Sequence, residues 1–543
     1  MKTYLPLLLP LLLAASAVLC AAEIPARTWT GKDGRTMTGT YLHGDGVTVW
    51  IDRKPGGKVG VPLADLVLVD QTAVKALQSD FAWKLPSARW PQKVEAPATR
   101  PALEDSKQKK GKMQVFRTMG AQSGFGFEFR VDQVLTPQQV GEFGRTFEAS
   151  IELFKLLPWD IRPAPPEGKH YLARLYENRL DFTTALNVKD EGSSRVLGLY
   201  RHGDRTIHAP LETLLGGRSA SNATLRHELA HQMMHDMLPL MPWWVAEGTA
   251  EYIRIIPWDG RGVYLCSAIN SPGTLKRLAA EGEMNEQAFG EMLSAGPDAP
   301  QEAQMGQHFA SAHGTAQEEL LRIRKSRADQ RAGKAPDTVA AGRKQKAAVQ
   351  YGTVAAFASP FQDEGQATVL KYHAAKLLVY YLQHLEGDGK GARMLQLMWH
   401  LRQWADEMNL QRARFAKEAE QFPAAYDKYH ARAKDFDKME AAYAEDYVNW
   451  LRTNTGKPTD SPKPLAPEEE LLKLLPAPPE YTAFMPHRIQ ARWTEIRNKT
   501  IGEKPESYYQ AILDAFKAKK IELPVLEGDP RTVRPKPLKV IIK

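Results

Sequence analysis

One stretch of the chain decides the fold expected of the rest, and it reads Ser221-Asn222-Ala223-Thr224-Leu225-Arg226-His227-Glu228-Leu229-Ala230-His231-Gln232-Met233-Met234-His235. Its apolar residues Leu225, Leu229 and Met233 recur every four positions, which is typical of one buried helical face. Ser221 or Asn222 ahead of them can cap the helix. We therefore expect a helix that carries His227 and His231 one turn apart on the same side.

The two histidines have the spacing of a pair of metal ligands. Imidazoles four residues apart on a helix can reach one ion, which zinc binds at about 2.0 to 2.1 Å from each nitrogen. Glu228 follows the first histidine, about 100° round the helix, so it can flank the ion without ligating it. A carboxylate in that place can take the proton of a metal-activated water. The pattern indicates Zn²⁺ as cofactor and Glu228 as catalytic base.

A catalytic zinc site also needs a third protein ligand from elsewhere in the chain, with the fourth position left open. Fifteen residues separate His231 from Glu247, which is enough for the chain to turn and begin a second helix across the first. We expect Glu247 to be this third ligand. Glu251 lies one helical turn further on, where it can accept the free N–H of a metal-bound histidine and fix its tautomer.

These two segments resemble the gluzincin, or thermolysin-like, zinc metallopeptidases of the MA clan, and within them an uncharacterised exported bacterial group. The resemblance is carried by His227-Glu228-Leu229-Ala230-His231 and by Trp244-Val245-Ala246-Glu247-Gly248-Thr249-Ala250-Glu251-Tyr252. It extends loosely from about residue 125 to about residue 400. It implies an α+β fold, in which a twisted sheet has a substrate-pairing edge strand within 196–209 and the active-site helices follow. One position departs, because the common Asn before the third-ligand Glu is Ala246 here.

The resemblance also implies a catalytic tyrosine. Tyr372 opens a helix expected over 367–385 and occupies the place where related proteins carry a Tyr that stabilises the oxyanion. The alternative, a tyrosine packed in a helical interface, stays open. His235 extends the histidine row by one turn, but we expect it to be a core or surface residue. Cys266 is expected to be a small buried apolar residue.

These features predict an exported zinc metallopeptidase that hydrolyses peptide bonds with a metal-activated water and Glu228 as general base. Its partners would be peptide or protein substrates. The alternative is a catalytically silent, metallopeptidase-like envelope protein that acts as a binding or scaffold module and keeps the metal for stability. Peptide hydrolysis by the wild type, set beside Glu228→Gln, separates the two.

Residues 1–22 predict the location of the protein. One Lys near the start, an apolar run and small residues are typical of a secretory signal peptide, so we expect a secreted or periplasmic protein. An uncleaved anchor and a lipid-modified Cys20 are the alternatives. No later segment is apolar enough to cross a bilayer. The formal net charge of +8 over 543 residues is a mild excess that does not predict nucleic-acid binding.

Residues 23–80 alternate short β-prone runs with turn signals and predict a small antiparallel barrel. They resemble the SH3-like homology domain first described in endocytic adaptors, which implies binding to a peptide or protein partner. The residues that carry this resemblance are Arg27, Trp29-Thr30, Asp33-Gly34-Arg35, Val47, Val61-Pro62-Leu63, Leu66 and Asp70.

The remaining boundaries follow composition. Residues 81–112 are rich in Pro, Ala, Lys and Gln and predict a linker, and residues 113–405 form the metallopeptidase-like domain. Within it, residues 294–353 predict a helical or partly disordered insertion. Residues 406–455 predict a helical extension, and residues 456–543 a Pro-rich tail with one amphipathic helix.

Overall fold

The structure is a computed structural model of the chain. It describes residues 26–44, 48–53, 57–79, 90–96, 102–103, 114–117, 127–131, 135–161, 163, 165, 170–186, 197–215, 222–298, 300–331, 365–387, 389–455, 462–502, 504 and 506–529. The signal peptide expected at 1–22 lies outside these residues. The described chain is mixed α+β, with a small antiparallel sheet near the N-terminus and a helical C-terminal region. It divides into two compact units, Met1–Trp90 and Pro91–Lys543.

The first unit is a four-stranded antiparallel sheet with one helix. Its strands β1 (Arg27–Thr30), β2 (Thr36–Gly44), β3 (Thr48–Arg53) and β4 (Gly57–Pro62) pair in chain order and are followed by η1 (Leu63–Asp65) and α1 (Leu68–Ser79). The Asp70 carboxylate of α1 accepts hydrogen bonds from Arg27 at 2.5 Å and from Thr30 N at 2.7 Å. Helix and sheet enclose one core, which consists of Trp29, Tyr41, Val49, Ile51, Leu66 and Val74.

The second unit contains a six-stranded sheet in the order β10-β11-β9-β8-β7-β6. Its strands are β6 (Ala102–Leu103), β7 (Gln114–Arg117), β8 (Phe127–Val131), β9 (Tyr171–Tyr176), β10 (Leu199–Arg201) and β11 (Thr206–Pro210). The central strand β9 pairs in parallel with β8 and β11, and the other pairs are antiparallel. The hairpin strand β10 lies at the edge and joins β11 through η2 (His202–Asp204). The edge strand expected within 196–209 is therefore present.

Helix α3 (Pro137–Leu156) begins with the capping signal that its sequence carries. Thr136 Oγ1 accepts from Gln139 N at 3.3 Å, and Gln139 Oε1 accepts from Thr136 N at 2.8 Å, so two otherwise unpaired N–H groups are satisfied. The shorter helices α4 (Arg179–Leu186) and α6 (Leu211–Leu215) flank strand β11.

Three helices carry the candidate site: α7 (Ala223–Met233), α8 (Trp243–Ile255) and α12 (Gly365–His384), with η3 (Leu238–Leu240) between the first two. Helices α8 and α12 touch at Gly248, where an added Cβ would lie only 2.7 Å from the Ala375 carbonyl oxygen. Only glycine therefore allows this approach. Arg226 joins α7 to the end of α8, since its guanidinium donates to Ile256 O at 2.9 Å and Arg254 O at 2.7 Å. These bonds satisfy carbonyls that the end of a helix leaves unpaired.

The start of α7 differs from the expected cap. Asn222 adopts a left-handed conformation with φ 41° and makes no side-chain cap. Its amide instead donates to Thr146 Oγ1 at 2.9 Å and so ties α7 to α3. Ser221 lies outside the described residues.

The segment expected to be a linker contains ordered strands. Residues of β5 (Val94–Glu95) pair with β12 (Val263–Tyr264), and β6 closes one edge of the sheet. Val94 is buried, so the segment contributes to the core of the second unit. The linker prediction for 81–112 was therefore wrong for these residues, because the sequence between two units can still add edge strands. Beyond β12 come η4 (Cys266–Asn270), α9 (Pro272–Ala280) and α10 (Glu286–Ser294), with Cys266 buried as predicted.

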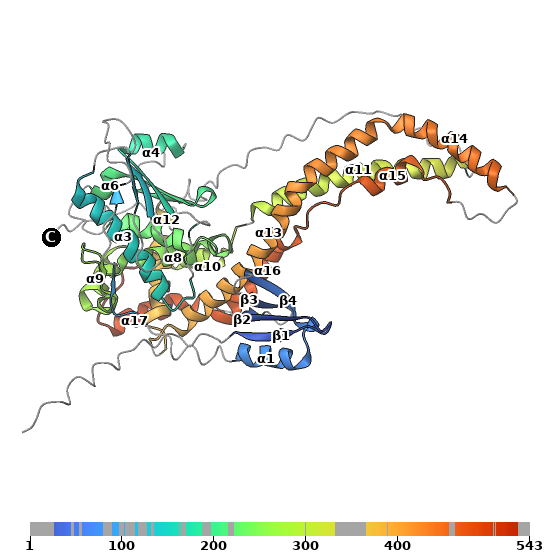
Figure 1. The fold of residues 1–543 in the computed structure, drawn as a ribbon. Helices are drawn as coiled ribbons and strands as arrows, with labels where there is room; N and C mark the ends of the chain where they lie inside the picture. The colour runs from blue at the N-terminus through green and yellow to red at the C-terminus, as the bar shows by residue number, and fades with distance from the viewer. Residues whose placement is uncertain are drawn as a thin grey trace, which may run out of the picture. The chain divides into compact units, whose positions relative to one another are not determined.

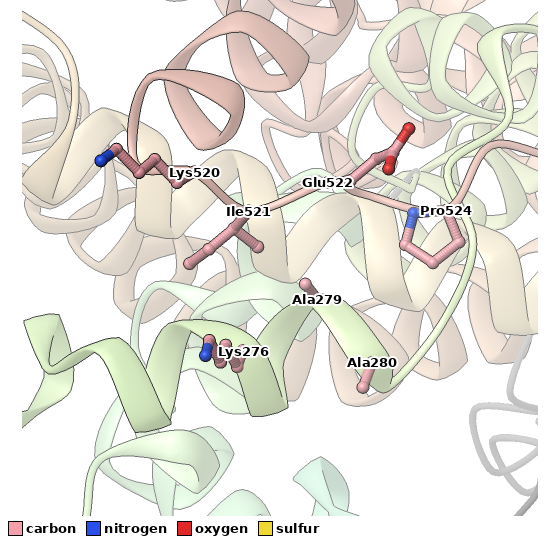
Figure 2. A pocket seen from close by; sticks show the side chains of 7 residues that line it. All are labelled: Lys276, Ala279, Ala280, Lys520, Ile521, Glu522 and Pro524. Atoms are coloured by element: carbon pink, nitrogen blue, oxygen red, sulfur yellow. The ribbon is translucent and has the colours of Figure 1, made fainter.

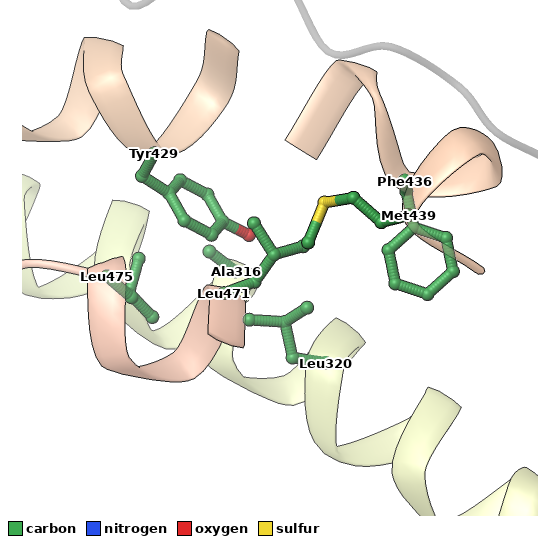
Figure 3. Close-up of a cluster of buried hydrophobic side chains, with 7 residues drawn as sticks. All are labelled: Ala316, Leu320, Tyr429, Phe436, Met439, Leu471 and Leu475. Carbon is green, nitrogen blue, oxygen red and sulfur yellow. The ribbon is translucent and has the colours of Figure 1, made fainter. Parts of the chain in front are cut away.

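Helices α13 (Ala392–Lys434) and α14 (Phe436–Asn454) follow one another along a long helical arm, with α11 (Gln301–Arg331) and α15 (Pro467–Leu474) packed against them (Figure 1). Figure 3 shows the apolar cluster that joins them, formed by Ala316, Leu320, Tyr429, Phe436, Met439, Leu471 and Leu475. Of the predicted insertion, residues 301–331 form α11, while residues 332–353 lie outside the described part. Helix α13 runs without a break through the predicted boundary at 405/406.

The tail prediction was also wrong. Residues 456–543 contain α15, η5 (Thr482–Phe484), α16 (Pro486–Thr500) and α17 (Ser507–Ala518) rather than one helix. Pro467 and Pro486 stand in the first turns of their helices, where the missing N–H costs nothing. Leu526 N donates to Met284 O at 2.8 Å, so this part of the chain packs into the second unit.

Two further features of the described chain bear on function. A pocket of about 320 Å³ lies between α9 and residues 520–524 and contains none of the candidate ligands (Figure 2).

Within the described ranges, every helix is too short or too polar to traverse a lipid bilayer.

Candidate metal centre

Three side chains from two helices converge on one point. The Nε2 atoms of His227 and His231 lie 3.1 Å apart. Glu247 Oε2, from α8, lies 3.2 Å from His227 Nε2 and 3.5 Å from His231 Nε2. The two imidazoles stand edge to face, with 4.8 Å between ring centroids, because they occupy successive turns of α7. Among the described residues, this trio is the group that could hold a metal ion.

The geometry of the trio fits a zinc ion. Ligand atoms about 2.0 to 2.1 Å from a tetrahedral zinc lie roughly 3.3 Å from one another, which matches the three separations. Glu247 Oε2 is buried and makes no well-formed hydrogen bond, and it is oriented toward the two ring nitrogens. Two histidines and one glutamate also form the ligand set of many catalytic zinc sites.

Glu251 lies on the Nδ1 side of His227, opposite the Nε2 atom that faces the trio. Its Oε1 lies 3.0 Å from His227 Nδ1, so a proton on Nδ1 leaves Nε2 free to ligate. Arg254 in turn donates to Glu251 Oε2, from Nε at 3.0 Å and from NH2 at 2.7 Å. Burial alone would raise the pKa of Glu251, but the contacts with His227 and Arg254 outweigh it and hold that pKa below its usual range. The structure thus places the Glu251 carboxylate beside Nδ1 of His227, and its role as an acceptor for a metal-bound histidine stays a prediction.

Glu228 is buried beside the trio and is held by the edge strand. Its Oε2 accepts a hydrogen bond from Tyr200 N at 2.7 Å. An added Cβ at Gly198 would lie 3.1 Å from Glu228 Cγ, so the glycine lets the chain before β10 lie against the carboxylate. Burial raises the pKa of Glu228, while His227 and His231 pull it down. A carboxyl group with a raised pKa is better suited to take up a proton near neutral pH.

Comparisons with known proteins find no relative of this chain: no family model, curated sequence or solved structure matches it. The support for any chemistry at the centre is therefore the geometry of its own residues.

Tyr372 reaches the same centre from α12. Its ring packs edge to face on Trp243, with 4.9 Å between centroids. Burial raises the pKa of the phenol, and the nearby carboxylates of Glu247, Glu228 and Glu251 raise it further. A neutral phenol beside these carboxylates can act as a hydrogen-bond donor. The structure thus brings Tyr372 together with the predicted ligands and base.

His235 does not join the trio. Its Nδ1 lies 2.8 Å from the Tyr200 hydroxyl, and its ring stacks on His202 with 4.0 Å between centroids. Burial lowers the pKa of His235 to about 2, which keeps the ring neutral. A packing role was expected for this residue, and its position outside the metal group agrees.

Sequence reasoning missed three charged residues next to the centre: Arg254, Glu281 and Lys376. Lys376 Nζ donates to Glu281 Oε2 at 2.6 Å, and Arg254 NH2 donates to the same oxygen at 3.1 Å. Lys and Glu are ordinary on helices, and these residues come from three separate segments. The spacing from Glu251 to Arg254 allows a local ion pair, and it was the one signal available in the sequence.

Proposed function

We propose that the chain is an exported, gluzincin-type zinc peptidase that hydrolyses peptide bonds with a metal-activated water. His227, His231 and Glu247 would hold Zn²⁺, and Glu228 would be the general base. The observation that carries this proposal is the set of separations of 3.1, 3.2 and 3.5 Å among three ligand atoms, with a buried carboxylate on the neighbouring residue. Export is supported by the character of residues 1–22.

The residues of the centre divide the chemical work. Bound zinc would lower the pKa of a water to about 7 and polarise the carbonyl of the scissile bond. Glu228 Oε2 already accepts from Tyr200 N, so Oε1 is the oxygen that we expect to take the water's proton and pass it to the leaving amine. The Tyr200 bond keeps the carboxylate from swinging away between these two transfers.

Substrate binding is supported by the place of β10 at the edge of the sheet. A strand at an edge can pair its main chain with an extended peptide, which gives affinity without selecting particular side chains. Because Tyr200 of this strand also holds Glu228, a peptide bound along β10 would lie next to the base.

Metal removal tests the proposal. Treating the purified protein with a chelator should abolish hydrolysis of a library of internally quenched peptides, and one equivalent of Zn²⁺ per chain should restore it. A control with Mg²⁺ should restore nothing, because Mg²⁺ prefers six oxygen ligands. If the zinc-loaded protein leaves the whole library and denatured protein substrates uncut, the catalytically silent envelope protein becomes the better interpretation.

Tyr372→Phe tests the oxyanion role. Loss of the hydroxyl should lower kcat by roughly 10²- to 10³-fold, the cost of one oxyanion donor, and leave zinc content unchanged. Tyr380→Phe is the matched control on the same helix, because the Tyr380 hydroxyl donates to Asn270 Oδ1 at 2.5 Å and does not serve the centre. Equal kcat values for the two variants would reduce Tyr372 to a packing residue.

A further inference from the structure

A chain of charged side chains, buried at Lys376 and half-buried elsewhere, runs from the first metal ligand to the helix of Tyr372. Glu251 Oε1 lies 3.0 Å from His227 Nδ1, and Arg254 NH2 donates to Glu251 Oε2 at 2.7 Å. Arg254 also donates to Glu281 Oε2 at 3.1 Å, and Lys376 Nζ donates to that same oxygen at 2.6 Å. The Lys376 side chain is only 3% exposed. This set of Glu251, Arg254, Glu281 and Lys376 is called the ion chain below.

The ion chain connects three segments of the fold. Glu251 and Arg254 belong to α8, Glu281 caps the end of α9, and Lys376 belongs to α12, one turn after Tyr372. The charges alternate in sign, with two carboxylates and two cations, so the chain is neutral as a whole. Removing one partner of a buried ion pair leaves a charge without compensation, so its neighbours must rearrange.

Arg254 explains how Lys376 and Glu281, at the far end of the ion chain, can affect the Glu251 carboxylate. Its guanidinium is shared between Glu251 and Glu281, and Lys376 neutralises Glu281 from the other side. Without the lysine, Glu281 would attract Arg254 more strongly and weaken its hold on Glu251. Without Glu281, Arg254 would lose one of its two anchors. Either change loosens the carboxylate that orients His227.

We propose that Lys376 and Glu281 are positioning residues of the metal centre. They fix Arg254 on Glu251 and thereby the orientation of His227, and they align the helix of Tyr372 with the metal ligands. The inference rests on the zinc centre of the proposed function, but it concerns metal binding rather than peptide hydrolysis.

Zinc affinity, measured by competition with a chromogenic chelator, tests the proposal in Lys376→Met and Glu281→Gln. Each variant should bind zinc roughly 10- to 100-fold more weakly, the usual cost of losing a partner behind the ligands. If the two residues acted only through the electric field of their charges, the two variants would change zinc affinity in opposite directions, because removing a cation strengthens zinc binding and removing an anion weakens it. If the two residues position the ligands, both variants bind zinc more weakly. The absorption spectrum of the Co²⁺-loaded protein should also shift in both variants, because it reports ligand geometry.

Lys371→Met is the matched control. Lys371 lies on the same helix and pairs with Glu291 of α10 at 3.3 Å, so the variant removes the same charge and a comparable contact without touching the ion chain. Its zinc affinity and cobalt spectrum should equal those of the wild type. The double variant Glu281→Gln with Lys376→Met should lose less affinity than the two single losses multiplied, because the residues act as one unit.

The outcomes separate the inference from the proposed function. A wild type that binds no zinc overturns the zinc centre itself. A wild type that binds zinc, with Lys376→Met and Glu281→Gln shifting affinity in opposite directions or not at all, overturns only the positioning role. If Lys376→Met fails to fold, the cobalt spectrum of Glu281→Gln decides, because both interpretations predict weaker zinc binding in this variant but only positioning shifts its spectrum; the Glu281 side chain is 26% exposed, so the substitution is tolerated.

Discussion

Glu228→Gln is expected to lower kcat by roughly 10²- to 10⁴-fold, the usual contribution of a general base, while the zinc content stays at the wild-type value. The amide cannot take a proton from water, but its oxygen can still accept from Tyr200 N, as the carboxylate does at 2.7 Å. The three ligand atoms belong to other residues, so the ion should remain bound. Single-turnover hydrolysis of a quenched peptide and metal analysis of the same sample provide the two measurements.

A suitable control is Glu152→Gln, which removes the same charge from α3, a helix that carries no ligand. Its kcat should equal that of the wild type. Unchanged turnover in Glu228→Gln, with zinc in place, would mean that another group takes the proton, and the assignment of the base would have to be withdrawn.

The second large effect is expected from His231→Ala. Removing this imidazole leaves one histidine and one carboxylate, too few protein ligands for a stable catalytic zinc site. The purified variant should contain no zinc after dialysis and should show no turnover. Nε2 of His231 lies 3.1 Å from Nε2 of His227. Among the described residues, the ligand group consists of His227, His231 and Glu247, so we expect no other side chain to replace the lost imidazole.

His235→Ala is the control for this loss. It removes a second histidine one turn further along, whose Nδ1 faces the Tyr200 hydroxyl at 2.8 Å rather than the trio. This variant should keep one zinc per chain. Zinc retained in His231→Ala and lost in His235→Ala would show that the ligand set is misassigned.

The candidate metal centre could be predicted from the sequence because its parts follow local geometric rules. Helical geometry fixes the direction of His227 relative to His231, and of Glu247 relative to Glu251, without reference to the rest of the fold. The crossing of the two helices was expected from the fifteen residues between His231 and Glu247, and α7 packs against α8 in the structure. Zinc binding and catalysis remain predictions, while the convergence of the three side chains is observed.

Other parts of the centre could not be read from the sequence. The donor to Glu228 is the backbone of Tyr200, and every residue has such a group, so no residue type marks it. Lys376 and Glu281 are 95 positions apart, and their pairing depends on how α9 and α12 pack. Nothing in the composition of either segment indicates that packing.

The extra helices of residues 456–543 have a local physical cause. This segment was predicted to be a Pro-rich tail with one helix, yet Pro467 and Pro486 stand in the first turns of α15 and α16. A proline is tolerated there because its N–H is not needed for an intrahelical bond. Length and composition alone could not show that the C-terminal segment pairs with Met284.

The contact at Gly248 has a consequence for how substrate can enter. Because no layer of side chains separates α8 from α12 there, we expect the two helices, and with them Glu247 and Tyr372, to move together. If the proposed peptide hydrolysis holds, we expect a peptide to be admitted by movement of the segments around these two helices, while the separation of the Glu247 carboxylate and the Tyr372 phenol changes little.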